Sequence, residues 1–261
     1  MGEWVPLFDL LARASSTIPD TKRSSMKKAF QDNARMMFLG PPGVGKGTYA
    51  SRIAPKLDIP TISTGDLVRA EIKRDSALGK QIKEFSSTGK LVPDDIILTM
   101  VRARLQEHDA KRGYILDGFP RNASQAVEFD KIDTLDLVVN FDLPEWVLLE
   151  KISGRRMCAS CGTGYNVANI NRGEYVMPPL LPKVDRLCDK CGSAQLVQRP
   201  DDAVDVVRHR LQVYADETEP LIAYYEAKGV LKNFHVTKGL ADLDRLMQVL
   251  LSGVDSIESK L

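Results

Sequence analysis

The stretch MMFLGPPGVGKGTYA, residues 36–50, constrains the fold of this 261-residue sequence more than any other part of it. Met36–Leu39 predict a buried strand, and Gly40 to Lys46 follow with the spacing of a phosphate-binding loop. Glycines let backbone N–H groups approach an anion, and the helix that follows adds the positive end of its dipole. In this loop Gly47 separates Lys46 from the hydroxyl of Thr48. The stretch therefore predicts a site for nucleotide phosphates between a strand and a helix.

Other strand-like runs are separated by longer segments of helical period, and they occupy residues 59–63, 113–116, 135–141 and 230–236. Continuously apolar strands that alternate with helices predict an α/β fold, a doubly wound parallel sheet with helices on both faces. Ligands of such sheets bind at the carboxyl ends of the strands. Polar motifs follow the predicted strands at Thr64-Gly65-Asp66 and Asp117-Gly118, so we expect them to meet the glycine loop.

The four cysteines form two knuckles, Cys158 with Cys161 and Cys188 with Cys191, each with two residues between the cysteines and a glycine after the second. This spacing lets four thiolates turn onto one tetrahedral ion, and it predicts a closed structural zinc site within a small insertion. A redox couple, a catalytic metal and an unmetallated site are the alternatives.

Composition excludes some classes of partner. The formal net charge of +1 predicts no overall attraction to nucleic acid or to an anionic membrane, and no apolar run approaches membrane-spanning length. Residues 1–34 are basic and serine-containing with an amphipathic patch, as in an organelle transit segment, but they also contain acidic residues. A mitochondrial or other organellar location and a cytoplasmic location with an inert extension both stay open.

Further motifs complete a pattern: ISTGDLVR (62–69), GKLVPD (89–94), LDGFPRNASQA (116–126), GRR (154–156), and RPDD with RHRL (199–211). In this order and spacing, and with the Lys-Gly-Thr form of the loop, the chain from Arg35 to about Leu251 resembles the adenylate kinases of the nucleoside monophosphate kinase family. The cysteine insertion resembles the zinc-binding lid of their long form. Lid closure is well known for these enzymes.

The resemblance implies a P-loop NTPase-type core in residues 35–261, with an NMP-binding helical insertion at 63–92 and a lid at 154–202. It implies reversible transfer from Mg·ATP to AMP, giving two ADP, by a monomer that needs Mg²⁺ and structural Zn²⁺. The residues implied for ATP are Gly43, Val44, Gly45, Lys46, Gly47, Thr48, Lys151, Arg155 and Tyr165. Those implied for AMP are Thr64, Arg69, Lys90, Leu91, Val92, Gly118, Arg121, Gln125, Arg199 and Arg210. The implied catalytic set is Lys46, Asp117, Arg121, Arg155, Arg199 and Arg210, with Asp117 and Asp66 on the water shell of Mg²⁺ and Cys158, Cys161, Cys188 and Cys191 on zinc.

The sequence departs from the family pattern at two places. Lys151 stands where an arginine commonly lies beside the donor base, and lysine cannot stack on a base as a flat guanidinium does. Because a mitochondrial branch of the family prefers GTP, GTP as the donor is the nearest alternative to ATP. The stretch between Cys161 and Cys188 is unusually long, and its NINRGEYVMPPLLP has no role that the sequence indicates. After it, Asp201 or Asp202 is expected to cap a long helix. A nucleotide-hydrolysing P-loop switch and a zinc-ribbon module that binds nucleic acid are more distant alternatives.

Overall fold

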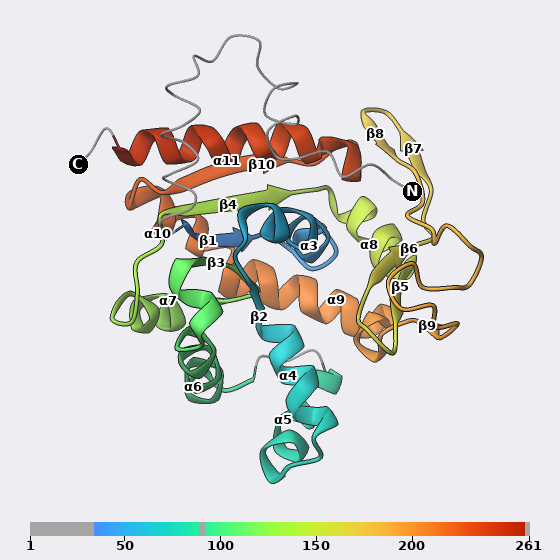
Figure 1. Cartoon of the computed structure of the whole chain (residues 1–261), viewed down its shortest axis with the longest axis horizontal. Coiled ribbons are helices and arrows are strands. Elements are labelled where there is room, and N and C mark those ends of the chain that lie inside the picture. The colour runs from blue at the N-terminus through green and yellow to red at the C-terminus, as the bar shows by residue number, and fades with distance from the viewer. Residues whose placement is uncertain (1–33, 89–91, 259–261) are drawn as a thin grey trace.

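The computed structural model describes residues 34–88 and 92–258, and a parallel sheet forms its centre (Figure 1). Within these residues the sheet has five strands in the order β10-β4-β1-β3-β2. Their bounds are β1 Ala34–Leu39, β2 Thr61–Ser63, β3 Gly113–Asp117, β4 Leu137–Asp142 and β10 Leu231–His235. In the central strand β1, Met36 pairs with Ile115 of β3 and with Leu137 of β4. The predicted parallel sheet is confirmed, and the predicted segment 1–34 lies outside the described residues except for Ala34.

Helices cover both faces of the sheet. One apolar cluster joins Phe38 and Val139 to the helices α3 (Lys46–Leu57), α8 (Glu145–Ser153) and α11 (Leu243–Glu258). The other joins Met37 and Val138 to the helices α6 (Asp94–Leu105), α7 (Ala123–Asp130) and α10 (Leu221–Ala227). Neighbouring strand residues alternate between the two clusters because successive side chains of a strand point to opposite faces. The doubly wound fold is thus confirmed.

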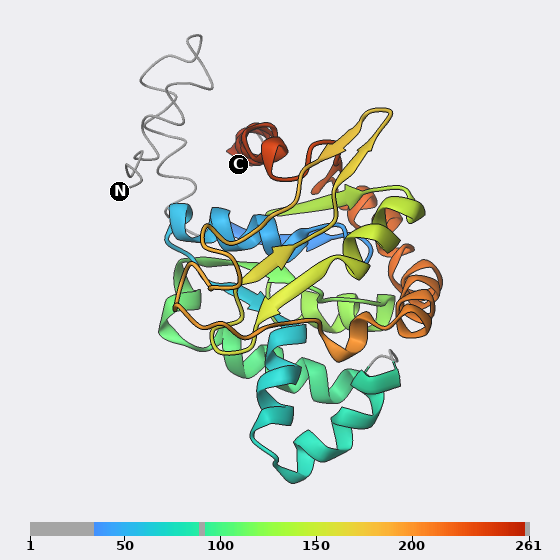
Figure 2. The ribbon, with the colours of Figure 1, turned by 90° about the vertical axis from the view of Figure 1, so that its right-hand side faces the viewer.

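Two segments extend from this core. Helices α4 (Thr64–Lys73) and α5 (Ala77–Thr88) follow β2 and project away from the sheet (Figure 2). Residues 154–202, which we call the cysteine segment, hold an antiparallel sheet of β5 (Arg155–Cys158), β6 (Gly164–Asn166) and β9 (Leu196–Val197). They also hold a hairpin of β7 (Ile170–Arg172) and β8 (Tyr175–Met177), and end in the turn η2 (Pro200–Asp202). The other elements are η1 (His108–Arg112), α9 (Val204–Val213), η3 (Tyr214–Thr218) and η4 (Gly239–Asp242).

Every strand has a boundary shifted by one or two residues, and β2 and β4 begin two residues later than predicted because backbone groups before them have other partners. The N–H of Ile59 donates to Ala54 O at the end of α3, so β2 begins only at Thr61. The carboxylate of Asp136 accepts from the N–H of Arg35 at 2.8 Å, and β4 begins at Leu137. No helix in the described part of the chain is long and apolar enough to cross a membrane.

Candidate active site

The glycine loop joins β1 to α3 and packs too closely on its neighbours for larger residues. Gly43 has φ 88°, and a Cβ there would lie 2.5 Å from Cγ1 of Ile152. Gly45 has φ 113° and precedes the first turn of α3, so it too has the left-handed conformation that favours glycine. Val44 is fully buried below them. The loop thus has a tightly packed, glycine-dependent backbone that leads directly into the N-terminus of α3, the position at which an anion is favoured.

Lys46 is at the centre of the site's electrostatics. Its Nζ donates to the carbonyl oxygens of Gly40 at 2.6 Å and of Pro41 at 3.0 Å. Burial lowers the pKa of Lys46 to about 8. The charge of Asp117 acts to raise this pKa, whereas the charges of Arg121, Arg210 and Arg155 lower it further. Burial also raises the pKa of Asp117, the last residue of β3, whereas Lys46 and Arg121 act to lower it. A carboxylate and several cations from separate elements therefore face one another next to the loop.

A second group of residues lies at the carboxyl ends of β2 and β3. The hydroxyl of Thr64, which is buried, donates to Gly118 O at 2.7 Å, and Nε of Arg121 donates to the same oxygen at 2.8 Å. Burial lowers the pKa of Arg121 to about 10, and the nearby charge of Arg210 contributes. Arg69 of α4 forms an ion pair with Asp66 at 2.5 Å. The structure thus brings the predicted arginines Arg69 and Arg121 to one edge of the sheet.

Gln125 connects this edge to two residues that sequence reasoning missed. It is buried, its Oε1 accepts from the N–H of Arg121 at 2.8 Å, and its Nε2 donates to Oδ1 of Asp94 at 2.7 Å. Asn122 caps α7 through the N–H of Gln125 and also donates to Asp94. Both residues lie within quoted motifs, Asp94 at the end of GKLVPD and Asn122 in LDGFPRNASQA, and an Asn before a helical run is typical of an N-cap, but no role was assigned to either. Lys90 and Leu91 lie outside the described residues, and Val92 is buried.

The arginines at the ends of the cysteine segment pair with two acidic residues. Arg155 Nη1 lies 3.3 Å from Oδ1 of the buried Asp202, and Arg210 Nη1 lies 2.9 Å from Oδ2 of Asp201. Burial raises the pKa of Asp202, against the charge of Arg155. Nε of Arg199 is buried and has no hydrogen-bond partner among the described residues, which leaves it able to donate to an anion. Arg155, Arg199 and Arg210 thus come together although Arg210 lies 55 residues after Arg155 in the sequence.

The prediction that Asp201 or Asp202 caps the following helix was wrong. Helix α9 begins after Ala203 and has no side-chain cap. The turn η2 directs the two carboxylates to the arginines, whose burial would cost far more without a counter-charge than one helix N-terminus gains from a cap.

Two residues predicted to contact ATP have protein partners. Nζ of Lys151 donates to Val44 O at 3.3 Å, so the lysine lies against the glycine loop. Burial lowers its pKa to about 8, with a contribution from Arg155. Tyr165 is buried within the cysteine segment, where its hydroxyl donates to Sγ of Cys188 and accepts from the N–H of Asp189. Lys151 is therefore beside the loop, and Tyr165 supports a knuckle.

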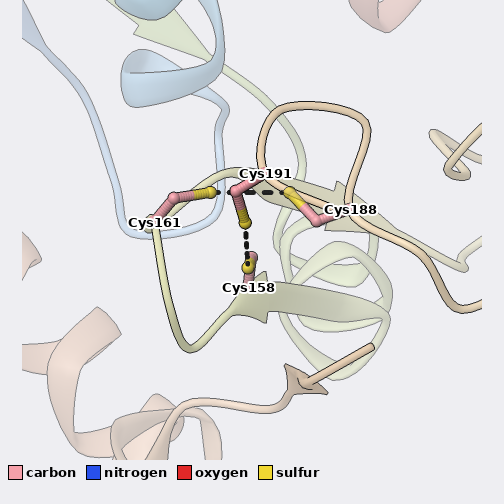
Figure 3. A group of neighbouring side chains, drawn as sticks. All are labelled: Cys158, Cys161, Cys188 and Cys191. Carbon is pink, nitrogen blue, oxygen red and sulfur yellow. Dashed lines mark hydrogen bonds between the residues drawn. The ribbon is translucent and has the colours of Figure 1, made fainter. Parts of the chain in front are cut away.

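The four cysteines converge within the cysteine segment (Figure 3). They are free thiols, and their sulfur atoms lie within 4.8 Å of one another. Cys158 Sγ is 3.6 Å from Cys191 Sγ, and Cys161 Sγ is 3.5 Å from Cys188 Sγ. Zinc–sulfur bonds of about 2.3 Å place tetrahedral ligands about 3.8 Å apart, so the arrangement fits one zinc ion. The soft sulfur donors suit the same metal.

Comparisons with known proteins agree with this geometry. A family model described as "Adenylate kinase" matches residues 38–230. A protein of Thermodesulfovibrio yellowstonii named adenylate kinase is 47% identical over 214 residues, which cover 80% of this chain and 94% of the relative. An adenylate kinase of Desulfitobacterium hafniense is 44% identical over 86% of this chain and 98% of its own length. One of Archaeoglobus fulgidus is 41% identical over 85% and 99%. With a phosphate loop, converging arginines and a four-cysteine cluster in one fold, the chain belongs to the adenylate kinase family, whose members are nucleoside monophosphate phosphotransferases.

Proposed function

We propose that the protein transfers the γ-phosphoryl group of Mg·ATP reversibly to AMP, giving two ADP. The observation that carries the proposal is the gathering of charged side chains beside the phosphate loop, where Asp117, Arg121, Arg155 and Arg210 all lie near enough to the buried Lys46 to influence its pKa. These groups come from β3, the loop before α7, β5 and α9. So much positive charge around a phosphate loop suits a reaction with two phosphate-bearing substrates better than the binding of one.

The roles divide according to position. Gly43 to Thr48 hold the donor phosphates, and Lys151 lies on the side of the donor base. Arg69 and Arg121 hold the acceptor monophosphate, with Thr64, Gly118, Gln125 and residues 90–92 around its base. Arginine suits these positions because its planar fork meets phosphate oxygens in pairs. Residues 63–92 would be the acceptor-binding region and residues 154–202 the lid.

In the forward step, an α-phosphate oxygen of AMP attacks the γ-phosphorus of ATP, and the bond from that phosphorus to the β–γ bridging oxygen breaks. Little covalent help from the protein is needed, because alignment and charge stabilisation supply most of the catalysis. Arg155, Arg199 and Arg210 face the transferring group, and closing of the lid excludes water that would otherwise hydrolyse ATP. Asp117, with Asp66 further out, would hold the water shell of Mg²⁺, which supplies charge neutralisation on the phosphates.

The thiolates of Cys158, Cys161, Cys188 and Cys191 would hold one structural zinc ion. Four sulfur ligands leave no open position, so its contribution is to the shape of the lid. We further propose that the protein acts as a monomer on nucleotides alone.

The deciding experiment measures ADP formation by the purified protein from Mg·ATP, with AMP present or omitted, and with Mg·GTP in place of Mg·ATP. AMP-dependent ADP production is expected. A larger kcat/KM with GTP would assign the donor to GTP instead, which the change from arginine to Lys151 keeps as the second candidate. ADP production at an equal rate without AMP would identify a hydrolase and contradict the proposal.

A further inference from the structure

The hairpin β7–β8 departs from the cysteine segment and packs on the core. Its Ile170 and Met177 are buried in the apolar cluster of α3, α8 and α11. The N–H of Val176 donates to Thr237 O, just beyond β10, at 2.9 Å. At its base, Asn166 and Leu180 pair through two backbone hydrogen bonds of 2.9 and 2.8 Å. Figure 2 shows the hairpin rising next to the start of the C-terminal helix. The hairpin is therefore anchored to the core, although it lies between the two cysteine knuckles in sequence.

Polar and aromatic contacts fix the hairpin to the carboxyl ends of two core strands and to α8. The hydroxyl of Tyr175 lies 3.0 Å from Nε2 of His235, whose Nδ1 lies 2.9 Å from Oδ2 of Asp142. The ring of Tyr175 meets Trp146, in the first turn of α8, edge to face at 5.7 Å. The guanidinium of Arg172 lies 5.0 Å from the centre of the same indole. The hairpin thus contacts α8 through Trp146 and the end of β10 through His235.

Helix α8 and the loop that follows β10 both lie near the glycine loop. Helix α8 carries Lys151, which contacts Val44 O, and a Cβ at Gly45 would lie 3.6 Å from its Nζ. After β10, the loop Thr237–Asp242 reaches α3, where the hydroxyl of Tyr49 donates to Gly239 O at 2.7 Å. Buried Asp242 shapes this loop by accepting from the N–H groups of Thr237 and Lys238 at 2.8 and 2.6 Å. The loop and Lys151 therefore lie beside the same end of the phosphate site.

We propose that the hairpin β7–β8 is a positioning element for the donor nucleotide, and that Tyr175 and Arg172 act as its positioning residues. By binding Trp146 and His235 together, they hold α8 and the loop Thr237–Asp242 at a fixed separation around the donor base. This inference rests on the proposed assignment of the donor to the side of Lys151. In this role the NINRGEYVM stretch keeps the donor site preformed, so that the walls of the site do not have to be ordered when the nucleotide binds.

The test compares nucleotide dissociation constants of the full chain, measured by calorimetry with Mg·ATP alone and with AMP alone. Tyr175→Phe removes one hydroxyl, and the double variant Tyr175→Ala with Arg172→Ala removes both contacts to Trp146. Asn171→Ala, at an exposed position of the same hairpin, is the matched control. The double variant should weaken Mg·ATP binding about fivefold, with a smaller loss for Tyr175→Phe, because the walls of the donor site are then ordered only on binding. AMP binding should stay within about twofold in every variant.

Three results would overturn the inference: an unchanged constant for Mg·ATP in the double variant, equal losses for ATP and AMP, or the same loss in Asn171→Ala. A lower melting temperature with unchanged Mg·ATP binding would likewise show a structural role only. Since these are binding measurements without turnover, they are independent of the ADP-formation assay. Absence of AMP-dependent ADP formation would defeat the proposed function, whereas the binding constants alone decide the role of the hairpin.

Discussion

The core and the cysteine segment contribute to one site but are held together by different means. In the core, Phe38, Val139, Leu246 and their neighbours are almost fully buried in a large apolar cluster. In the cysteine segment, the cluster of buried residues near the knuckles consists, among the described residues, of Cys158, Tyr165 and Cys188. Six of the eight exposed large apolar side chains in the described chain belong to this segment, so it does not bury its own apolar residues well. Such a module needs another source of stability, and four thiolates offer it.

The comparison has a functional consequence. Lys46, Asp117 and Arg121 lie at or just beyond the carboxyl ends of the core strands β1 and β3, whereas Arg155 and Arg199 lie near the two ends of the cysteine segment. In the proposed lid closure, the phosphate loop stays with the core, whereas Arg155 and Arg199 move with the part of the cysteine segment that lies outside the anchored hairpin β7–β8. The variants below separate the contributions of the two regions, beginning with the largest expected effect.

Replacing Arg121 with alanine should lower kcat/KM by an amount equivalent to roughly 3 kcal/mol or more of transition-state stabilisation, because it removes a charge expected to stabilise the transferring phosphoryl group. Steady-state kinetics of ADP formation measure the loss. The melting temperature and zinc content should stay near those of the wild type, since the core and the knuckles are untouched. Wild-type kinetics in this variant would refute the assigned role.

Leu246→Ala tests the core without touching the site. Leu246 is fully buried on α11, and loss of its side chain should cost about 3 kcal/mol of unfolding free energy through lost burial and the cavity left behind. Urea unfolding followed by far-UV circular dichroism gives the value. Zinc content per folded molecule should not change. A variant that also lost its zinc would show that the stability of the cysteine segment depends on the packing of the core.

The fold could be predicted from the sequence because its signals are local. The five apolar runs became the five strands of the described sheet, with boundary shifts of one or two residues, and the phosphate loop connects the predicted strand and helix. Where the prediction was wrong, a distant partner decided the outcome. An acidic pair before an apolar run is typical of a helix cap, and nothing near Asp202 in sequence shows that Arg155 will lie 3.3 Å away.

The contacts of the hairpin β7–β8 could not be predicted from the sequence for the same reason. Tyr175 meets His235 across sixty residues of sequence and Trp146 across twenty-nine, and no alternation of residue types encodes these contacts. The turn does have a sequence signal, which is Gly173 between the short strand segments 170–172 and 175–177. In the structure this glycine adopts φ 61°. The structure brings Lys46, Asp117 and Arg121 close together, whereas Lys90 and Leu91 lie outside the described residues. Asp94 and Tyr49 belong to quoted motifs, but their contacts could not be predicted, because Gln125 and Gly239 are distant from them in the sequence.

Cys158→Ser addresses the stability of the cysteine segment. Removing one ligand should abolish most zinc binding and with it about 2 kcal/mol of apparent stability, the contribution of a ligand present at tens of times its dissociation constant. Zinc content by atomic absorption and the melting temperature, with and without a chelator, measure the effect, and Ser160→Ala in the same knuckle is the control. Turnover per folded molecule should fall less than stability does. Equal melting curves with lost activity would contradict a structural zinc.

The prediction with the smallest effect near neutral pH is a dependence of the kinetics on pH, and it sharpens the electrostatic side of the comparison. Burial lowers the pKa of Lys46 and of Lys151 to about 8 in the nucleotide-free protein, and bound phosphates raise these values because they favour the charged amine. The affinity contributed by each charge is therefore fully present below pH 8 and is lost as the pH rises above it. We expect kcat/KM for Mg·ATP to be level near pH 7 and to fall above pH 8 by about tenfold per pH unit for each lysine that must be charged. Lys151→Arg, which keeps its charge throughout, should make the decline shallower, and a profile that stays level to pH 9.5 would show that neither amine loses its proton in the free enzyme.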